Sequence, residues 1–223
     1  MSPSPLKQRL QQHPDRLRLV QHPFFDHLQT AAVTRELAAR FVGQWWHPLH
    51  YFPTFLSNTI AASRSLAVKT ATSRILFQEL GEGDPSRAHE NIYITTMQGA
   101  GFTPRQIVDA PPLPSTAALV RGYDESSRDP FTGIGFLYAT EVADLAMVSG
   151  IGTAVRRAVG AERLPWVDIH VQQEPAHVHE ADTTVDADLD EAQTGVVIRT
   201  AEQAWTLWVG FFDSLYELAD RTS

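Results

Sequence analysis

Signals for the start and end of helices recur along this sequence, whereas the alternation of apolar and polar residues that is typical of strands does not. Thr34 can cap a helix, and Asp84–Pro85 and Thr103–Pro104 each combine an N-cap residue with a proline at the first helical position. The segment VDADLDEAQTGVVI could hold one extended piece, but a single strand cannot build a sheet. We therefore expect an all-α chain, a single domain over residues 1–223 with about seven to nine helices.

Prolines and glycines predict where individual helices bend or stop. We expect Pro48 and Pro53 to kink or briefly break the helix that begins after Thr34, because a proline inside a helix removes one backbone hydrogen bond. Gly81 and Gly83 are expected to end the following helix, SLAVKTATSRILFQEL.

The second half of the chain contains the most apolar helices. Residues Phe131–Gly150 are apolar on nearly every face, which predicts a central, buried helix. A separate short helix is expected near Thr153–Val159. Thr200 and Gln203 form a capping-box pattern that predicts the start of a strongly apolar last helix.

Composition excludes several classes of protein. The chain has no cysteine, which rules out disulfides, thiolate metal sites and a cysteine nucleophile. It has 18 Lys and Arg against 26 Asp and Glu, a net charge of −8, so nucleic acid is not an expected partner. The sequence has neither a leader-like apolar segment nor an uninterrupted apolar run of about 18 residues, so we expect a cytoplasmic protein without a membrane span.

One group of residues has a spacing that suits a metal. His170, Glu174 and His177 form H-x3-E-x2-H, and offsets of four and seven residues bring all three to one face of a helix. The alternative is a solvated polar face in an acidic region. Pro175 disfavours helical geometry at Glu174, so the segment could instead be a loop that runs into a helix.

Two further positions could complete such a site. Glu141 lies in the middle of the most apolar helix, where an unpaired carboxylate would carry a large desolvation penalty and needs a cation. His89 follows the Asp84–Pro85 signal, and Glu79 and Glu82 lie near the preceding glycine turn. Each has an ordinary alternative: an arginine pair for Glu141, a structural role for His89, and solvent exposure for Glu82. Carboxylates and imidazoles together favour iron, manganese or zinc over magnesium or calcium.

The order of these residues resembles the heme-oxygenase-like diiron oxidases, the iron-containing redox enzyme family. The matching segments are QELGEGDPSRAH, EVADLAMVSG and HVQQEPAH, which lie in the family's order between Gln78 and His177. Glu174 stands where the family has Asp, and Glu82 could replace Glu79 because the turn before the His varies in length. The resemblance implies a heme-oxygenase-like helical bundle and six iron ligands, Glu79, His89, Glu141, His170, Glu174 and His177.

The resemblance also implies a function. It implies two iron ions that cycle between Fe2+ and Fe3+, with O2 as co-substrate and an external reductant. A peroxo-diferric intermediate would then oxidise a small substrate. We expect this substrate to be amino-acid-like and the reaction to belong to specialised metabolism. The reaction stays open among N-oxygenation, C–C cleavage and desaturation. Trp45, Trp46, Tyr51, Phe55 and Tyr138 are candidates for a substrate pocket, although core packing is the simpler interpretation.

Two other classes remain as alternatives. One is a cofactor-independent or hydrolytic enzyme of the same helical fold, similar to thiaminase II or the cofactorless oxidases. The other is a non-enzymatic helical binding protein whose His and Glu residues are incidental. The partners that we expect are a small-molecule substrate and an electron donor whose identity stays open, with a homodimer as one option for assembly. Arg121 and Arg156 could pair with a substrate carboxylate, although a surface charge is the simpler interpretation for both.

Overall fold

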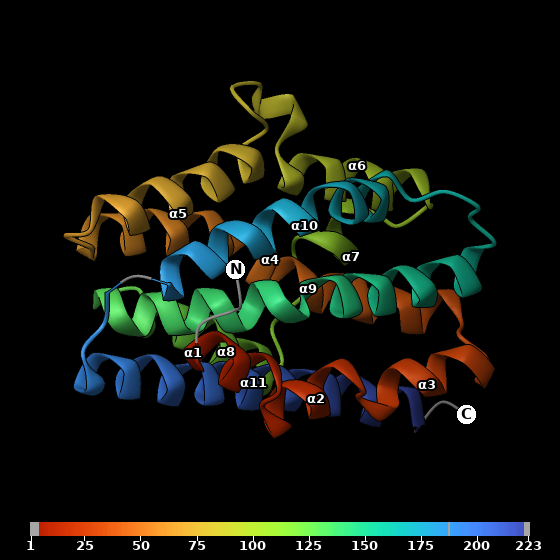
Figure 1. The fold of residues 1–223 in the computed structure, drawn as a ribbon. Helices are drawn as coiled ribbons and strands as arrows, with labels where there is room; N and C mark the ends of the chain where they lie inside the picture. The colour runs from red at the N-terminus through yellow and green to blue at the C-terminus, as the bar shows by residue number, and fades with distance from the viewer. Residues whose placement is uncertain (1–4, 187, 221–223) are drawn as a thin grey trace.

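The computed structural model describes residues 5–186 and 188–220, and every regular element in these two ranges is a helix (Figure 1). The elements, in chain order, are α1 (Pro5–Gln11), α2 (Pro14–Val20), α3 (Pro23–Thr30), α4 (Arg35–Ala62), α5 (Leu66–Glu79), the 3-10 helix η1 (Pro85–Arg87), α6 (His89–Gly99), α7 (Pro104–Ile107), α8 (Pro114–Ser126), α9 (Pro130–Val159), α10 (Pro165–Val185) and α11 (Glu191–Asp220).

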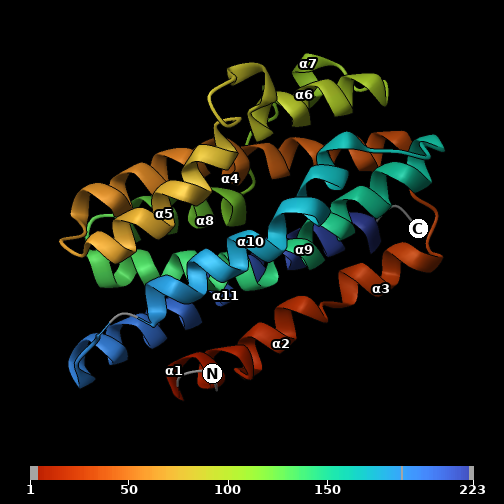
Figure 2. The same ribbon diagram turned by 45° about the horizontal axis from the view of Figure 1, so that its top comes forward.

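Helix α9 is the central element of the bundle. It packs against α4, α8, α10 and α11, and α10 also contacts α5, so that α10 lies between α5 and α9 (Figure 2). The short helices α2 and α3 run along the outside of α9 and α11 in both views. One continuous apolar cluster fills the interior. The expected all-α helical bundle is therefore confirmed.

By its length and composition alone, helix α9 could cross a membrane. Most of its apolar stretch is buried against the neighbouring helices, as expected for the core helix of a bundle. The expected central helix is thus present, but it is longer than Phe131–Gly150. It continues through Thr153–Val159, which is not a separate helix.

Internal prolines do not break the helices that contain them. Helix α4 begins after its cap Thr34, whose side chain accepts a hydrogen bond from Leu37 N, and it continues through Pro48 and Pro53. Helix α10 likewise continues through Pro175, so the expected alternative of a loop is wrong. The carbonyl that loses its helical donor there belongs to Val171, a residue that is 55% exposed at the surface of the bundle.

Several helix boundaries differ from those expected. Helix α11 begins at Glu191, well before Thr200, whose hydroxyl donates instead to Val196 O inside the helix. The cap is formed by Asp190 and Gln193, whose side chains each accept from the other's backbone N–H. The described residues contain eleven α-helices, more than seven to nine, because prolines start several helices of only four to eight residues.

Histidine caps two of these short helices. His13 and His22 each precede a proline, and the Nδ1 atom of each accepts a hydrogen bond from the backbone N–H two residues later. Their Nε2 atoms face carboxylates on α11, with His13 3.0 Å from Glu202 and His22 3.1 Å from Asp213. Each imidazole therefore caps its own helix and ties it to α11.

Candidate metal centre

All six predicted ligands meet in the interior, although they come from four helices. They form two groups in which the candidate ligand atoms all lie within 4.8 Å of one another. Each group contains carboxylates and imidazoles, and every member is buried. The first group is Glu79, His89 and His170, and the second is Glu141, Glu174 and His177.

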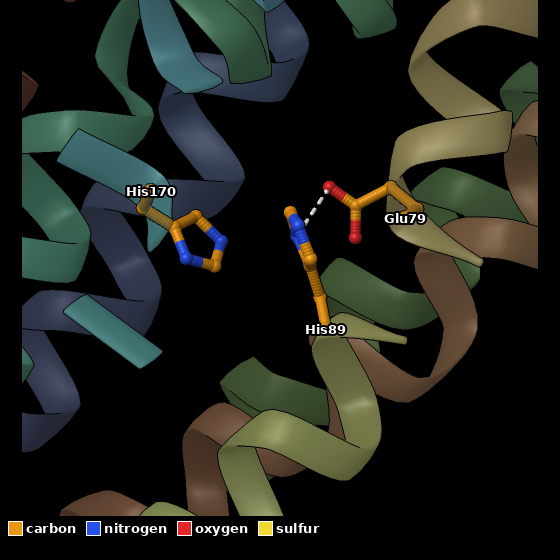
Figure 3. Close-up of side chains that lie close together, drawn as sticks. All are labelled: Glu79, His89 and His170. Atoms are coloured by element: carbon orange, nitrogen blue, oxygen red, sulfur yellow. Dashed lines mark ion pairs between the residues drawn. The ribbon is translucent and has the colours of Figure 1, made fainter. Parts of the chain in front are cut away.

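The first group joins the end of α5, the start of α6 and the middle of α10 (Figure 3). The three side chains point toward one another, and Glu79 Oε1 lies 3.0 Å from His89 Nδ1. The imidazole centroids of His89 and His170 are 4.8 Å apart. One carboxylate and two imidazoles thus converge on a common point.

A tight glycine turn between α5 and η1 positions this group. Gly81 has φ +85°, and a Cβ at that position would lie 2.2 Å from Asp84 O, so only glycine fits without rearrangement. Glu82 lies in the same turn at φ 57° and pairs with Arg87 at 3.0 Å, away from the buried group. Glu79 is therefore the carboxylate inside the cluster, and Glu82 is not.

The second group lies between α9 and α10. His177 Nδ1 is 3.4 Å from Glu141 Oε2 and 3.9 Å from Glu79 Oε1. The distance to Glu79 connects the two groups, because the same carboxylate oxygen faces His89 on one side and His177 on the other. Since α10 is helical through Pro175, His170, Glu174 and His177 share one face, as their spacing predicted.

Hydrogen bonds can fix the orientation of two of the three imidazoles. His170 Nδ1 lies 2.8 Å from Trp166 O, so a proton on Nδ1 is donated to this carbonyl and Nε2 is left as a ligand atom. His89 Nε2 lies 2.7 Å from Gln173 Oε1, which leaves Nδ1 facing Glu79. Such partners on the second nitrogen are typical of metal-binding histidines.

Several buried polar atoms of the cluster have no hydrogen-bond partner among the residues that the structure describes. They include Nε2 of His177, Oε1 of Glu141 and both carboxylate oxygens of Glu174. A buried carboxylate without donors is strongly disfavoured unless a cation or a proton compensates it. The arrangement of donor atoms therefore fits two metal ions, one in each group.

The electrostatics of the cluster are those of closely spaced charges in an apolar interior. Burial by itself would raise the pKa of Glu79, but the imidazoles of His89 and His177 outweigh it and lower that pKa to about 2. Burial, followed by repulsion from His89, lowers the pKa of His170 to about 4, so this imidazole is neutral at pH 7. Burial and two neighbouring carboxylates raise the pKa of Glu174. The metal-free cluster thus retains protons that a cation would displace.

A narrow cavity of about 30 Å³ adjoins both groups. Of the aromatic residues suggested by the sequence, Trp45 contributes to its wall, whereas Trp46, Tyr51, Phe55 and Tyr138 do not. Arg121 and Arg156 do not line it either. The wall also contains residues from α4, α8 and α11 that the sequence did not suggest for a pocket, namely Pro48, Leu49, Phe52, Tyr123 and Trp208. Thr140 and four of the predicted ligands, Glu79, Glu141, His170 and His177, line it as well.

Asp144 is a carboxylate of the site that the sequence analysis did not assign. It also lines the cavity, and its Oδ2 atom is buried. The available signal was its position three residues after Glu141 in the same apolar helix, which places both side chains on one face.

Comparison with protein families gives an independent assignment. The sequence pattern of a family described as "Iron-containing redox enzyme" matches residues 39–209, about three quarters of the chain. This span includes all six predicted ligands. A search of curated proteins found no match.

Solved structures share the whole architecture at low sequence identity. A CadD-like protein of unknown function from Nostoc punctiforme PCC 73102 superposes with a TM-score of 0.79 at 16% identity, covering 96% of this chain and 95% of that chain. A domain of unknown function with a heme oxygenase-like fold from Shewanella denitrificans OS217 has a TM-score of 0.75 at 16% identity, covering 95% and 90%. A TenA homologue from Pseudomonas syringae pv. tomato str. DC3000 has a TM-score of 0.75 at 14% identity, covering 97% and 94%. These likenesses establish the fold.

Proposed function

Because this chain belongs to the iron-containing redox enzyme family, we propose that it is a non-heme diiron oxidase or oxygenase that uses O2 and an external reductant to oxidise a small substrate. The observation that carries the proposal is the pair of buried groups, each with three ligand atoms, connected through Glu79 Oε1. Carboxylates can bridge two cations, and neutral imidazoles favour iron over magnesium or calcium.

In this proposal each group holds one iron ion. Glu79, His89 and His170 would bind one ion, and Glu141, Glu174 and His177 the other. When bound, the two irons supply the redox chemistry with dioxygen that protein side chains cannot perform. The chain's own contribution is to fix the imidazoles through Trp166 O and Gln173, and to surround the reaction with apolar rings that limit the access of water.

The cavity wall also bears on the substrate, which we propose to be amino-acid-like. Trp45, Tyr123 and Trp208 face the same space as the carboxylates of the cluster. Aromatic faces attract an ammonium group, so this wall favours the amino end of such a substrate. No lysine or arginine lies among the described residues that line the cavity, so a substrate carboxylate has no cationic side chain to pair with there.

The direct test is an anaerobic titration of the metal-free protein with Fe(II), followed by exposure to O2. We expect two irons per chain in the wild type and O2 consumption only after iron loading. His89→Ala and His177→Ala should each lower the iron stoichiometry with little change in helicity. His179→Ala is the matched control, because His179 lies on α10 but is exposed, and it should bind two irons.

The same experiment separates the proposal from two alternatives. The first alternative is a hydrolytic or cofactorless enzyme, which the fold shared with a TenA homologue allows. Such an enzyme would need no iron, and the histidine substitutions would not change its iron content. A helical binding protein would neither bind iron nor consume O2. Wild-type protein that takes up no iron under anaerobic conditions would refute the diiron proposal.

A further inference from the structure

Asp144 shares a helix face with Glu141 and is close to the same buried cluster. The two residues are three positions apart in α9, and both line the narrow cavity with His170 and His177. The Oδ2 atom of Asp144 is buried and accepts no hydrogen bond from any residue in the described part of the chain. A carboxylate oxygen in this position lacks the compensation that buried charges in proteins normally have.

Asp144 and Glu174 are both placed beside Glu141 and His177. Asp144 lines the cavity with these two residues, and Glu174 shares a candidate metal group with them. Neither oxygen of Glu174 receives a hydrogen bond from an N–H or a hydroxyl group within the described ranges. Two carboxylates that meet in apolar surroundings repel each other unless a proton or a cation lies between them.

Among the described residues, no lysine or arginine forms an ion pair with Asp144. The arginine that borders the outer side of the site is Arg16, which lines a surface groove with Glu141 and Glu174. Its guanidinium group donates to two backbone carbonyls, Val142 O and Gln11 O, and not to Asp144. An ordinary ion pair therefore does not account for the position of Asp144.

We propose that Asp144 is a seventh ligand of the metal centre and binds the cation held by Glu141, Glu174 and His177. This inference rests on the proposed function, because it requires a metal in the second group. With Asp144 the cluster contains four carboxylates, whose four negative charges equal the positive charge of two Fe2+ ions. The six-ligand set leaves one positive charge uncompensated in a buried site, which is unfavourable.

The test is Asp144→Asn, which keeps the size of the side chain but removes its charge. In an anaerobic Fe(II) titration followed by Mössbauer spectroscopy, we expect the variant to bind the second iron at least about 10-fold more weakly than the wild type while retaining the first. The spectrum should then show loss of one of the two iron environments. Asp168→Asn is the control, because Asp168 lies on α10 outside the cluster and pairs with Arg163 at 3.3 Å.

Thermal unfolding with and without iron gives a second readout that a structural role would not produce. If Asp144 binds the cation, iron should raise the unfolding temperature of the wild type more than that of Asp144→Asn, because a ligand stabilises the folded state in proportion to how tightly it binds. A structural carboxylate would leave the iron-dependent increase equal in the two proteins.

The outcomes distinguish this inference from the proposed function. Wild-type protein that binds no iron overturns both. Wild-type and Asp144→Asn proteins that each bind two irons with equal affinity overturn the role of Asp144 alone. An iron-dependent increase in unfolding temperature that is equal in the two proteins also counts against the ligand role.

Discussion

At the scale of single residues, the orientation of the imidazoles is set by groups that are not themselves candidate ligands. Gln173 lies between His170 and Glu174 in α10, and its Oε1 atom is 2.7 Å from His89 Nε2. Accepting the proton of Nε2 leaves Nδ1 of His89 free to face Glu79. Gln173 is therefore a positioning residue for a histidine on another helix.

Gln173→Leu should weaken iron binding, because His89 loses the acceptor that fixes its tautomer. The loss of such a partner typically lowers metal affinity about 10- to 100-fold. A competition titration against a chelator would measure it. Gln172→Leu is the control, because Gln172 is exposed on the same helix and should leave the affinity unchanged. Equal affinity for iron in the two variants would remove Gln173 from the positioning role.

The residue types and their order were enough to select the six side chains that the structure brings together. The spacing of His170, Glu174 and His177 determines a shared face once the segment is helical, and a carboxylate inside an apolar helix is conspicuous. Asp144 and Gln173 were not predicted, because their importance depends on distances to other helices. Those distances are set by helix packing, which sequence spacing does not encode.

At the scale of helices, the packing of α9 against α11 depends on a close approach of the two backbones. Gly135 in α9 lies against α11, where an added Cβ would be 2.5 Å from Val197 O. A second contact fixes the pair, since Trp205 Nε1 donates to Ala139 O at 3.0 Å. The two helices can therefore neither separate nor slide without losing buried contacts.

Gly135→Ala should lower the free energy of unfolding by about 1–3 kcal/mol, because the methyl group forces the helices apart. Gly210→Ala is the matched control, since Gly210 lies in α11 with no atom within 4 Å of an added Cβ. That variant should gain about 0.4–1 kcal/mol, because alanine is a better helix former. Urea denaturation of both variants would test this difference, and equal stability would contradict it.

Helix type was more predictable than helix boundaries. Apolar periodicity and caps such as Thr34 identify α4 from the sequence. The effect of Pro48, Pro53 and Pro175 was not predictable, because a helix packed on a core can tolerate a missing backbone hydrogen bond that would break it in isolation. The start of α11 was misplaced at Thr200 because Asp190 and Gln193 form an equivalent capping box ten residues earlier.

At the scale of the whole molecule, a buried histidine, His22, helps to attach the N-terminal helices to the bundle. His22 is almost fully buried, accepts from Phe24 N through Nδ1 and faces Asp213 through Nε2. Burial lowers the pKa of His22, nearby Arg18 adds to the effect, and Asp213 opposes it. Phe25 and Phe212 form the apolar part of its surroundings.

The lowered pKa of His22 predicts weaker attachment in acid. The pKa of His22 is lower in the folded protein than in the unfolded chain, where a histidine has a pKa of about 6.5. His22 therefore stays neutral to a lower pH in the folded protein. The stability that it contributes is complete above the unfolded pKa and is lost as the pH falls through the folded pKa. The substitution His22→Asn keeps an N-cap residue but removes the titrating group. Between pH 7 and pH 5, the free energy of unfolding of this variant should therefore fall less than that of the wild type, as measured by urea denaturation. Parallel pH profiles would exclude His22 as the source.

The size of the cavity beside the cluster has a consequence for the reaction proposed above. A volume of about 30 Å³ accommodates only one or two molecules as small as water. In that reaction dioxygen would fit the existing space, whereas an organic substrate is larger, and side chains of the cavity wall would have to move before it could bind. The plasticity of this wall, and not only its resting shape, would then decide which organic reactants are admitted.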